Sequence, residues 1–338
     1  MINLDLLDIL LKDEKKFNKN LYSSGPYWKY KNTKTVYQIK NGNFDNFRGL
    51  ENGIGTSFTD NIIYDYRNEL NIKGRIIASF FSLPLIKQIF IGQLNITYNH
   101  IINYLNNLSE IYKNNKKVLE LIKKYKFKNT TEFGCLSKFS KNNKEYSTQY
   151  LEMAHRIDIL NKKYNFKKIT SFFEIGGGFG ANIHFLQTNF PNIKKIIYLD
   201  TVPNIFIATK YLKKFYRDNV KDYLFTKKLK KISFANNNDL EIFCVAPWQI
   251  ENLDVEIDHF HNACSFVEMP DKVIRNYCQY IKKSKTKEIS IISYYPYDKK
   301  TTFNPKLLNK YFRNKLKIKF HDTLINEPNN KKLIFLTK

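Results

Sequence analysis

The chain is 338 residues long, about twice the length of a typical domain, and 43% of its residues are apolar. These figures favour a folded protein of two domains and exclude a disordered or fibrous chain. The formal charge is +25, but the 56 basic residues are 49 Lys and 7 Arg, divided evenly between the two halves. Proteins that read nucleic acids depend on the planar, bidentate fork of Arg, so this charge alone does not indicate a nucleic-acid partner.

Cysteine usage and the first residues of the chain point to a reduced compartment. No two cysteines have the spacing of a zinc-binding pair. Asp5 and Asp8 stand where a signal peptide needs positive charge followed by an apolar run. The apolar stretch 76–94 is interrupted by Pro84 and Lys87, so we expect a pair of buried helices there and not a membrane span. These features predict a cytoplasmic protein that does not insert into a membrane.

The hydrophobic pattern changes near residue 166. In residues 1–165, apolar side chains recur mostly at helical spacing, which predicts a mainly helical lobe. The aromatic and Gly-containing stretch 22–59 has no sustained period, and we expect a lid or an irregular hairpin there. Over residues 166–338, short apolar runs alternate with amphipathic stretches, which is typical of βαβ units. The sequence therefore predicts two domains, 1–165 and 166–338.

The second domain is predicted to be an α/β fold on a mostly parallel sheet. The expected strands are 171–175, 193–199, 232–235, 242–246, 257–262, 289–294, 318–321 and 333–336. The expected helices are 181–189, 202–216, 272–282 and 305–313. Only a short loop with a proline separates the last two strands, so we expect them to form an antiparallel hairpin at the sheet edge.

A glycine-dense turn after the first of these strands carries the sharpest signal for function. Glu174 lies just before it, and its glycines are Gly176, Gly177, Gly178 and Gly180. Without Cβ atoms, such a turn lets a ligand approach the backbone. Asp200, followed by Thr201, closes the next strand, where a carboxylate is placed to bind the two hydroxyls of a ribose. The pattern predicts that these residues bind a nucleotide-type cofactor.

Two cofactors fit this pattern. The spacing Gly176-x-Gly178-x-x-Ala181 also satisfies the dinucleotide fingerprint, so an NAD(P)-dependent oxidoreductase is the alternative. Glu174 favours S-adenosylmethionine, because a carboxylate attracts a sulfonium and an ammonium group and repels a pyrophosphate. The turn also follows a helical half that is placed to supply an acceptor site. We therefore predict S-adenosylmethionine as the cofactor.

Further blocks extend the likeness beyond the turn. Asp200 with Pro203, the segment 246–250 (Ala-Pro-Trp-Gln-Ile) and the segment 262–270 (Asn-Ala-Cys-Ser-Phe-Val-Glu-Met-Pro) complete the set. Over residues 130–300 the chain resembles the sugar O-methyltransferase family of bacterial surface-polysaccharide gene clusters. The resemblance implies a Rossmann-like class I methyltransferase sheet of seven strands with an antiparallel last strand. It also implies methyl transfer to a hydroxyl of a sugar, nucleotide-sugar or glycan acceptor of capsule or lipopolysaccharide type.

Candidate catalytic residues follow the fourth strand of this arrangement. We place 258–262 at the carboxyl end of that strand, where ligands bind in open α/β sheets. A sugar hydroxyl loses its proton as the new bond forms, and His261 and Glu268 are the candidate general bases. Asn262 is predicted to position the acceptor or the cofactor. The alternatives are a structural histidine at 261 and a helix-capping carboxylate at 268.

Pro247 and Trp248 follow another predicted strand, in the region where class I enzymes hold adenine. We expect Trp248 to stack on the base, with a plug at the lobe interface as the alternative. Aromatic and hydrogen-bonding side chains suited to the acceptor are spread over the first domain: Tyr27, Trp28, Arg48, Tyr150, His155 and Arg156.

Three questions stay open in the sequence. Asp258, His259 and Glu268 are ligand types that a divalent ion accepts, but their spacing is not diagnostic and we assign no metal site. The helical lobe is expected to form the acceptor side, with a homodimer through it as an option. The charge leaves a nucleic-acid methyltransferase or binding protein as an alternative. The segment 262–265 lacks the Pro-Pro block of many amino-methylating enzymes, so we expect no nucleic-acid partner.

Overall fold

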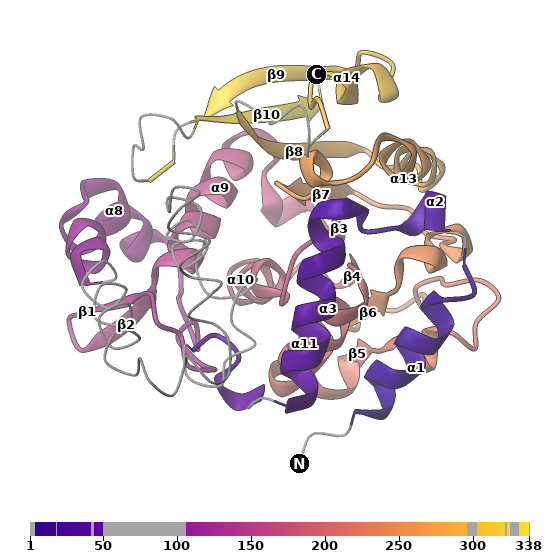
Figure 1. Ribbon diagram of the computed structural model, residues 1–338. Helices are drawn as coiled ribbons and strands as arrows, with labels where there is room; N and C mark the ends of the chain where they lie inside the picture. The colour runs from indigo at the N-terminus through magenta and orange to yellow at the C-terminus, as the bar shows by residue number, and fades with distance from the viewer. Residues whose placement is uncertain are drawn as a thin grey trace, which may run out of the picture. The chain divides into compact units, whose positions relative to one another are not determined.

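The computed structural model describes residues 4–17, 19–41, 44–49, 106–295, 303–321, 323–324 and 331–337 (Figure 1). The helix pair expected at 76–94 lies outside these residues. The described α-helices are α1 (Asp5–Glu14), α2 (Lys19–Tyr22), α3 (Gly25–Asn41), α8 (Lys116–Lys124), α9 (Thr148–Tyr164), α10 (Ala181–Asn189), α11 (Val202–Tyr216), α12 (Tyr223–Thr226), α13 (Asp271–Lys283) and α14 (Leu307–Tyr311). Within the described residues, no helix is both long and apolar enough to cross a membrane.

The strands form a small hairpin and one large sheet. The hairpin pairs β1 (Lys138–Lys141) with β2 (Lys144–Ser147). The large sheet contains β3 (Ser171–Ile175), β4 (Lys195–Leu199), β5 (Val220–Lys221), β6 (Glu241–Val245), β7 (His259–Ala263), β8 (Glu288–Tyr295), β9 (Leu316–His321) and β10 (Lys331–Thr337). Its strand order is β5-β6-β4-β3-β7-β8-β10-β9.

This order confirms the predicted α/β fold class. The pairs from β5 to β8 are parallel, and β10 runs antiparallel to both β8 and β9. The expected hairpin of the last two strands is therefore confirmed, with β9 at the edge. The described sheet has eight strands, one more than the family resemblance implies, because the short β5 adds an edge beside β6. The strand predicted at 232–235 is wrong: Ile232 makes a single bridge to Leu253.

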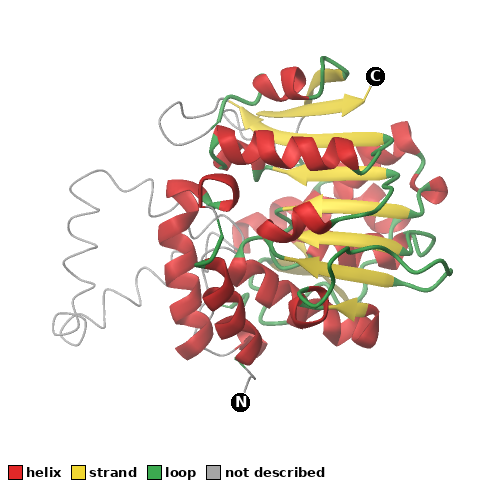
Figure 2. Cartoon of the chain, turned by 90° about the vertical axis from the view of Figure 1, so that its right-hand side faces the viewer, coloured by secondary structure: helices red, strands yellow, loops and turns green. Residues whose placement is uncertain are grey.

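Helices cover both faces of the sheet, as Figure 2 shows. On one face Phe173, Phe260 and Ile291 belong to an apolar core that also takes in α13. The other face carries a polar row in register across four strands, namely Tyr198, Glu174, His261 and Ser290. Each of these four residues is at most 2% exposed. Buried polar groups are costly unless they are hydrogen-bonded, so each of these side chains needs a partner in the protein or in a ligand. This face of the sheet is therefore the candidate for a binding site.

The N-terminal helices correct the expectation of a lid or hairpin for residues 25–41, while residues 50–59 of the same stretch lie outside the described residues. Residues 25–41 form the helix α3, and α1 packs beside α11. The side chains of α3 that turn inward, at positions 28, 31 and 35, include Lys31 at 8% and Thr35 at 1% exposed. These positions recur at helical spacing but are mostly polar, so the helix lacks an apolar period in the sequence. Figure 2 shows these helices standing where the parallel strands end.

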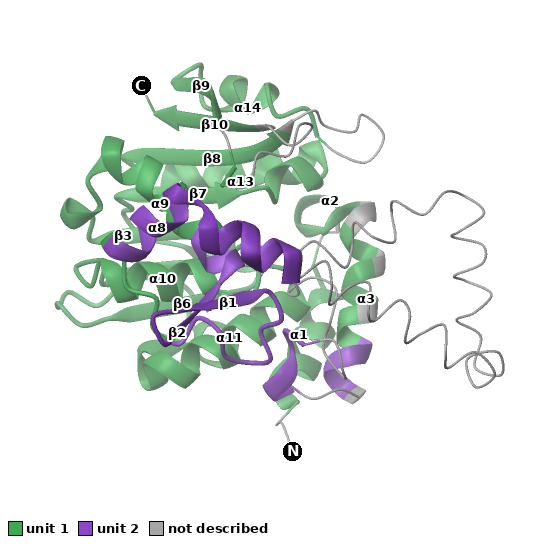
Figure 3. Ribbon diagram, turned by 90° about the vertical axis from the view of Figure 1, so that its left-hand side faces the viewer, with its two compact units in different colours: residues 1–36, 124–128, 152–338 green, residues 37–123, 129–151 purple. Residues whose placement is uncertain are grey.

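The chain divides into two compact units (Figure 3). Unit 1 holds residues 1–36, 124–128 and 152–338, and unit 2 holds residues 37–123 and 129–151. These boundaries differ from the predicted division at residue 165. The first three dozen residues belong with the sheet, because α1 and α2 pack on α11 and α13. The acceptor and dimer roles expected for the N-terminal part stay predictions.

Arg48 organises the described part of unit 2. Its side chain is 2% exposed, and its guanidinium donates to the carbonyl oxygens of Thr130 (2.7 Å) and Glu132 (3.2 Å). It also donates to Cys135 Sγ (3.0 Å) and Ser147 Oγ (2.9 Å). These bonds tie the segment 44–49 to the β1–β2 region. The role suggested for Arg48 in acceptor binding is therefore replaced by a structural one.

Replacing Arg48 with Lys should lower the free energy of unfolding by on the order of 3 kcal/mol. A Lys ammonium is a point charge that cannot reach four acceptors, and it leaves buried carbonyl oxygens unpaired. Thermal unfolding of the full chain measures the loss. As a control, Lys138→Met removes an exposed ion pair with Glu145 and should change stability by no more than about 0.5 kcal/mol. Equal midpoints for the two variants would contradict the structural role.

Candidate functional site

The glycine turn after β3 opens at one position. Gly176, Gly178 and Gly180 have φ of 76°, 64° and 87°, which side-chain-bearing residues rarely adopt. A Cβ on Gly176 would lie 2.1 Å from Ser265 Oγ, and one on Gly177 would lie 2.4 Å from Glu174 Oε2. A Cβ on Gly178 would meet no atom within 4 Å. The turn is therefore closed by the protein at Gly176 and Gly177 and accessible to a ligand at Gly178.

Glu174 comes just before this turn, and only one of its two carboxylate oxygens has a hydrogen-bond partner among the described residues. The residue is 2% exposed, and its Oε1 accepts a hydrogen bond from Asn182 Nδ2 at 2.8 Å. Its Oε2 is buried and has no partner among the described residues. Burial raises the pKa of Glu174 to about 7, against the Asn182 hydrogen bond and with help from the charge of Asp200. A cationic ligand at this point would satisfy Oε2 and stabilise the ionised form.

Asp200, at the end of β4, holds the turn in place. Its Oδ2 accepts from Gly178 N at 2.9 Å, and its Oδ1 accepts from Thr201 N at 2.7 Å and Asn204 Nδ2 at 3.0 Å. Burial raises the pKa of Asp200, and these hydrogen bonds oppose the shift. The carboxylate thus joins the turn to the start of α11. The ribose contact predicted for Asp200 and Thr201 stays a prediction, because a diol would have to share these oxygens with the protein.

Tyr198 is a residue of this site that the sequence prediction missed. It is fully buried, and its hydroxyl lies 3.0 Å from Asp200 Oδ2 and within hydrogen-bonding distance of the Gly178 carbonyl oxygen. The sequence did offer an indication, because Tyr198 places a phenol hydroxyl inside an apolar run, two residues before Asp200. Asn182, the partner of Glu174, was also missed, since a single Asn in a predicted helix carries no pattern.

Asn262 connects the ends of β7 and β3. Its Nδ2 donates to the Ile175 carbonyl oxygen at 2.8 Å and to Ser265 Oγ at 2.5 Å, while its Oδ1 accepts from Phe266 N at 3.2 Å. Ser265 is the residue that closes the turn over Gly176. In this arrangement both amide hydrogens of Asn262 are used inside the protein. The side chain therefore positions the turn and the following segment.

Glu268 is placed as a titratable group at the carboxyl edge of the sheet. It ends the short helix η5 (Phe266–Glu268) that follows β7. Its Oε2 accepts from Trp28 Nε1 at 2.7 Å and its Oε1 from the Tyr294 hydroxyl at 2.5 Å. Burial raises the pKa of Glu268, and these two hydrogen bonds oppose the shift. The helix-capping alternative is not seen, because α13 begins at Asp271 and no side chain caps it.

His261 has a different environment. It is 2% exposed inside the polar row, and its Nδ1 lies 2.8 Å from Ser290 Oγ. Burial, followed by the positive charge of Arg156, lowers the pKa of His261 to about 3. An imidazole with so low a pKa is a weak proton acceptor near neutral pH. Of the two predicted bases, Glu268 therefore has the more suitable position and environment.

The placement of Asp258 and His259 at the carboxyl end of the strand is wrong. The strand β7 begins at His259, so both residues lie at its amino end, away from the glycine turn. Asp258 Oδ2 accepts from Thr170 N at 2.8 Å, and its Oδ1 accepts from Lys287 Nζ at 2.7 Å. Glu268 follows the opposite end of β7. In the described part of the chain, no three His, Cys, Asp or Glu residues are grouped so as to hold a metal ion.

Trp248 is held by protein neighbours. It follows Pro247 in the short helix η4 (Pro247–Asn252) and is 5% exposed. Its ring stacks on Phe17, with ring centroids 4.9 Å apart, and its Nε1 donates to the Tyr223 hydroxyl at 3.2 Å. This packing against the end of α1 resembles the plug alternative. The adenine contact of Pro247 and Trp248 stays a prediction.

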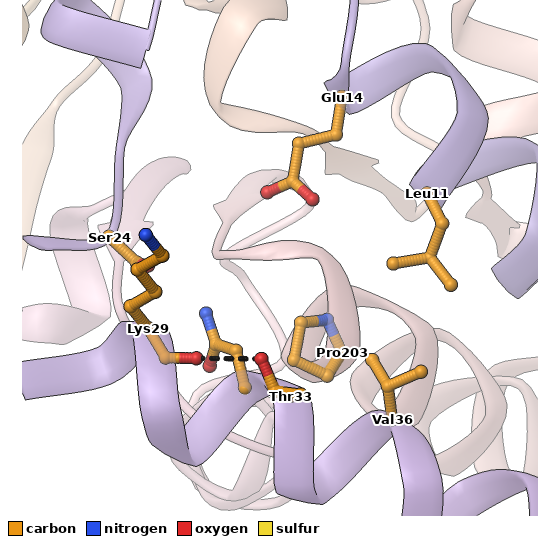
Figure 4. Close-up of a pocket in the computed structure, with 8 residues that line it drawn as sticks. Leu11, Glu14, Ser24, Lys29, Thr33, Val36 and Pro203 are labelled. Atoms are coloured by element: carbon orange, nitrogen blue, oxygen red, sulfur yellow. Dashed lines mark hydrogen bonds between the residues drawn. The ribbon is translucent and has the colours of Figure 1, made fainter. Parts of the chain in front are cut away.

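A cavity of about 280 Å³ lies between α1, α3 and the start of α11 (Figure 4). Glu14 of α1 and Pro203 of α11 face each other across it, and Thr33 of α3 lines another side. None of the predicted site residues lines this cavity. Its nearest link to the site is along the chain, since Pro203 comes three residues after Asp200.

The acceptor residues predicted in the first domain are only partly brought to this edge. Trp28 contacts Glu268, and the ring of His155 lies 5.0 Å from that of His321, at the end of β9. Arg48 and Tyr150 belong to unit 2, where the guanidinium carbon lies 5.9 Å from the tyrosine ring centroid. The side chain of Tyr27 lies outside the described part of the molecule.

Comparisons with known proteins give fold-level likenesses. No family model and no curated protein matches the chain. A SAM-dependent methyltransferase from Aquifex aeolicus superposes with a TM-score of 0.36 at 11% identity, over 54% of this chain and 89% of that one. Magnesium protoporphyrin IX methyltransferase from Synechocystis PCC 6803, with bound SAM, gives 0.34 at 10% identity, over 55% and 78%.

Two alanine substitutions in the turn should separate ligand access from folding. Gly178→Ala should cost only about 1 kcal/mol of stability, because its positive φ is strained but its Cβ meets open space. Gly176→Ala should cost about 3 kcal/mol, because its Cβ also overlaps Ser265. Thermal unfolding ranks the two variants, and calorimetry with S-adenosylmethionine should show at least about tenfold weaker binding for Gly178→Ala. Unchanged binding by that variant would show that the ligand does not approach there.

Proposed function

We propose that this protein is an S-adenosylmethionine-dependent O-methyltransferase whose acceptor is a sugar hydroxyl of a capsule- or lipopolysaccharide-type polysaccharide or its activated precursor. The observation that carries the proposal is the unpartnered Oε2 of Glu174, which is buried against Gly177, the residue before the accessible Gly178. A buried carboxylate of this kind fits a ligand that brings positive charge, and it opposes a pyrophosphate. The sheet order places this point where β3 and β7 adjoin.

The residues present fit S-adenosylmethionine as follows. Glu174 Oε2 would pair with its ammonium group, and the backbone of Gly178 would lie along the ligand. Asp200 and Thr201 would meet the ribose, and Pro247 with Trp248 would border the adenine. When bound, the cofactor supplies an electrophilic methyl group on a sulfonium centre. Asn262 keeps the turn in the shape that this placement requires.

The chemistry needs a proton acceptor beside the attacking oxygen. With S-adenosylmethionine bound, its methyl group would be supplied to the acceptor oxygen, which has to lose its proton. The hydroxyl proton moves to Glu268, whose carboxylate Trp28 and Tyr294 orient by hydrogen bonds. Positioning supplies much of the rate in such transfers. His261 and Asn262 would then act as positioning residues.

The sugar acceptor rests on the motif resemblance and on side chains near Glu268. Trp28 and Tyr294 offer aromatic faces of the kind that sugars pack against. A cytoplasmic location fits an activated precursor, and a homodimer through the N-terminal lobe is kept as an expectation.

Binding of S-adenosylmethionine should depend on pH through Glu174. Only its ionised form attracts the cation, so affinity should rise about fivefold between pH 6 and pH 7, given a pKa of about 7, and level off above pH 8. Calorimetry across this range measures the effect. Glu174→Gln should bind weakly at every pH, while the exposed control Glu145→Gln should keep the wild-type profile. Binding of NAD in place of S-adenosylmethionine would contradict the proposed function.

Glu268→Gln should reduce methyl transfer by about a hundredfold to ten-thousandfold, the usual contribution of a general base. The amide keeps acceptor capacity for one of its two donors, Trp28 or Tyr294, so the local structure should persist. The measurement is transfer of labelled methyl groups to a panel of nucleotide sugars, with cofactor affinity determined in parallel. His261→Gln should lose less than about tenfold. The roles of the two residues would be exchanged if His261→Gln proved the more damaging change.

A further inference from the structure

A row of polar side chains crosses three strands at the carboxyl edge of the sheet. Tyr294 of β8 is in register with Lys332 of β10, and Lys332 is in register with His321 of β9. Residues directly opposite one another on neighbouring strands lie on the same face of a sheet. This face also carries Glu174 and His261. The row therefore extends the polar face of the cofactor turn toward the sheet edge.

Lys332 is an unusual member of this row. It is only 9% exposed, and its ammonium lies 5.3 Å from the centroid of the Tyr294 ring. Within the described ranges it makes no ion pair or hydrogen bond with its side chain. A buried ammonium is costly unless an anion or several acceptors accompany it. The charge of Lys332 favours the ionised form of Glu268, but within the described ranges its three N–H donors have no acceptor and can receive an anion.

Other elements add positive charge around Lys332. His155 and Arg156 project from α9, and the His155 ring lies 5.0 Å from that of His321. Burial, followed by the charges of His155, Arg156 and Lys332, lowers the pKa of His321 to about 4. Lys31 of α3, over the Trp28 ring at 4.8 Å, favours the ionised form of Glu268 from the other side.

We infer that Lys332, His321 and Arg156 form a subsite for a phosphate group of the acceptor, next to the hydroxyl that faces Glu268. That the phosphate belongs to the methyl acceptor rests on the proposed function. That these residues bind a phosphate does not. The link between the two is Tyr294, which donates to Glu268 and whose ring faces the Lys332 ammonium. A phosphorylated or diphosphate-linked sugar would thus present its anion to the row and its hydroxyl to Glu268.

The arrangement favours phosphate over other anions. The cationic and donor groups come from three separate elements, α9, β9 and β10, and so approach from different directions. A tetrahedral phosphate accepts hydrogen bonds from several directions, whereas a carboxylate is best held by one bidentate Arg. The cluster is also compact and partly buried, unlike the extended basic surface that a nucleic acid needs.

The test is calorimetry of the full chain with inorganic pyrophosphate, inorganic phosphate and glucose 1-phosphate, using glucose as the neutral comparison. We expect at least one phosphate compound to bind and glucose to bind at least tenfold more weakly. Stronger binding of pyrophosphate than of glucose 1-phosphate indicates a diphosphate-linked acceptor, and the reverse order indicates a sugar phosphate. No binding of any phosphate compound overturns the inference.

Lys332→Met and Arg156→Gln should each weaken phosphate binding at least tenfold. They lie on different elements, so the second carries the test if the first fails to fold. The matched control is Lys319→Met, because Lys319 is an exposed lysine of β9. Equal losses for the control and for Lys332→Met would mean general charge attraction, and would also overturn the inference.

The same samples are titrated with S-adenosylmethionine. Phosphate binding that depends on Lys332 without cofactor binding would remove the proposed function and leave the anion subsite. Cofactor binding without phosphate binding would remove the anion subsite and leave the proposed function.

Discussion

The site depends on the hydrogen bonds that Asp200 accepts from the glycine turn and the start of α11. Through Gly178 N, Thr201 N and Asn204 Nδ2, one carboxylate fixes where β3 ends and where α11 begins. Gly178, whose N–H this carboxylate accepts, has a positive φ and a Cβ position that meets no atom within 4 Å. Glu174 is buried at the end of the neighbouring β3, with its Oε2 against Gly177 of the same turn.

The strand order gives this anchored turn its neighbours. Because β7 pairs with β3, Asn262 and Ser265 reach the turn from the adjoining strand, and Glu268 follows within one short helix. The reversal of β10 brings its first residues, including Lys332, to the same edge as the last residues of β8 and β9. One edge of the sheet therefore combines the unpartnered carboxylate of Glu174, the candidate base Glu268 and the basic cluster around Lys332. An enzyme that joins a cationic donor to an anionic acceptor needs such a division of charge.

The sequence predicted those features that local pattern determines. Apolar runs located most strands of the large sheet, and the glycines with Glu174 and Asp200 located the turn. The helix α3 was missed because its inward positions include the polar Lys31 and Thr35. Asp258 and His259 were misplaced because the whole segment 258–262 was assigned to the carboxyl end, whereas the strand runs from His259 to Ala263 and only its last residues reach that end. Tyr294, Lys332 and His321 meet only through strand pairing between distant segments, which no local pattern encodes.

Burial of Glu174 has a consequence for the lifetime of the folded chain. A carboxyl whose pKa rises from 4.5 to about 7 on folding destabilises the native state at higher pH. The cost is absent below pH 4.5, grows up to pH 7 and is then on the order of 3 kcal/mol. A cation bound at Oε2 removes much of this cost. Under the proposed function, the chain with S-adenosylmethionine bound would unfold less often than the free chain, and a protease would cleave it more slowly.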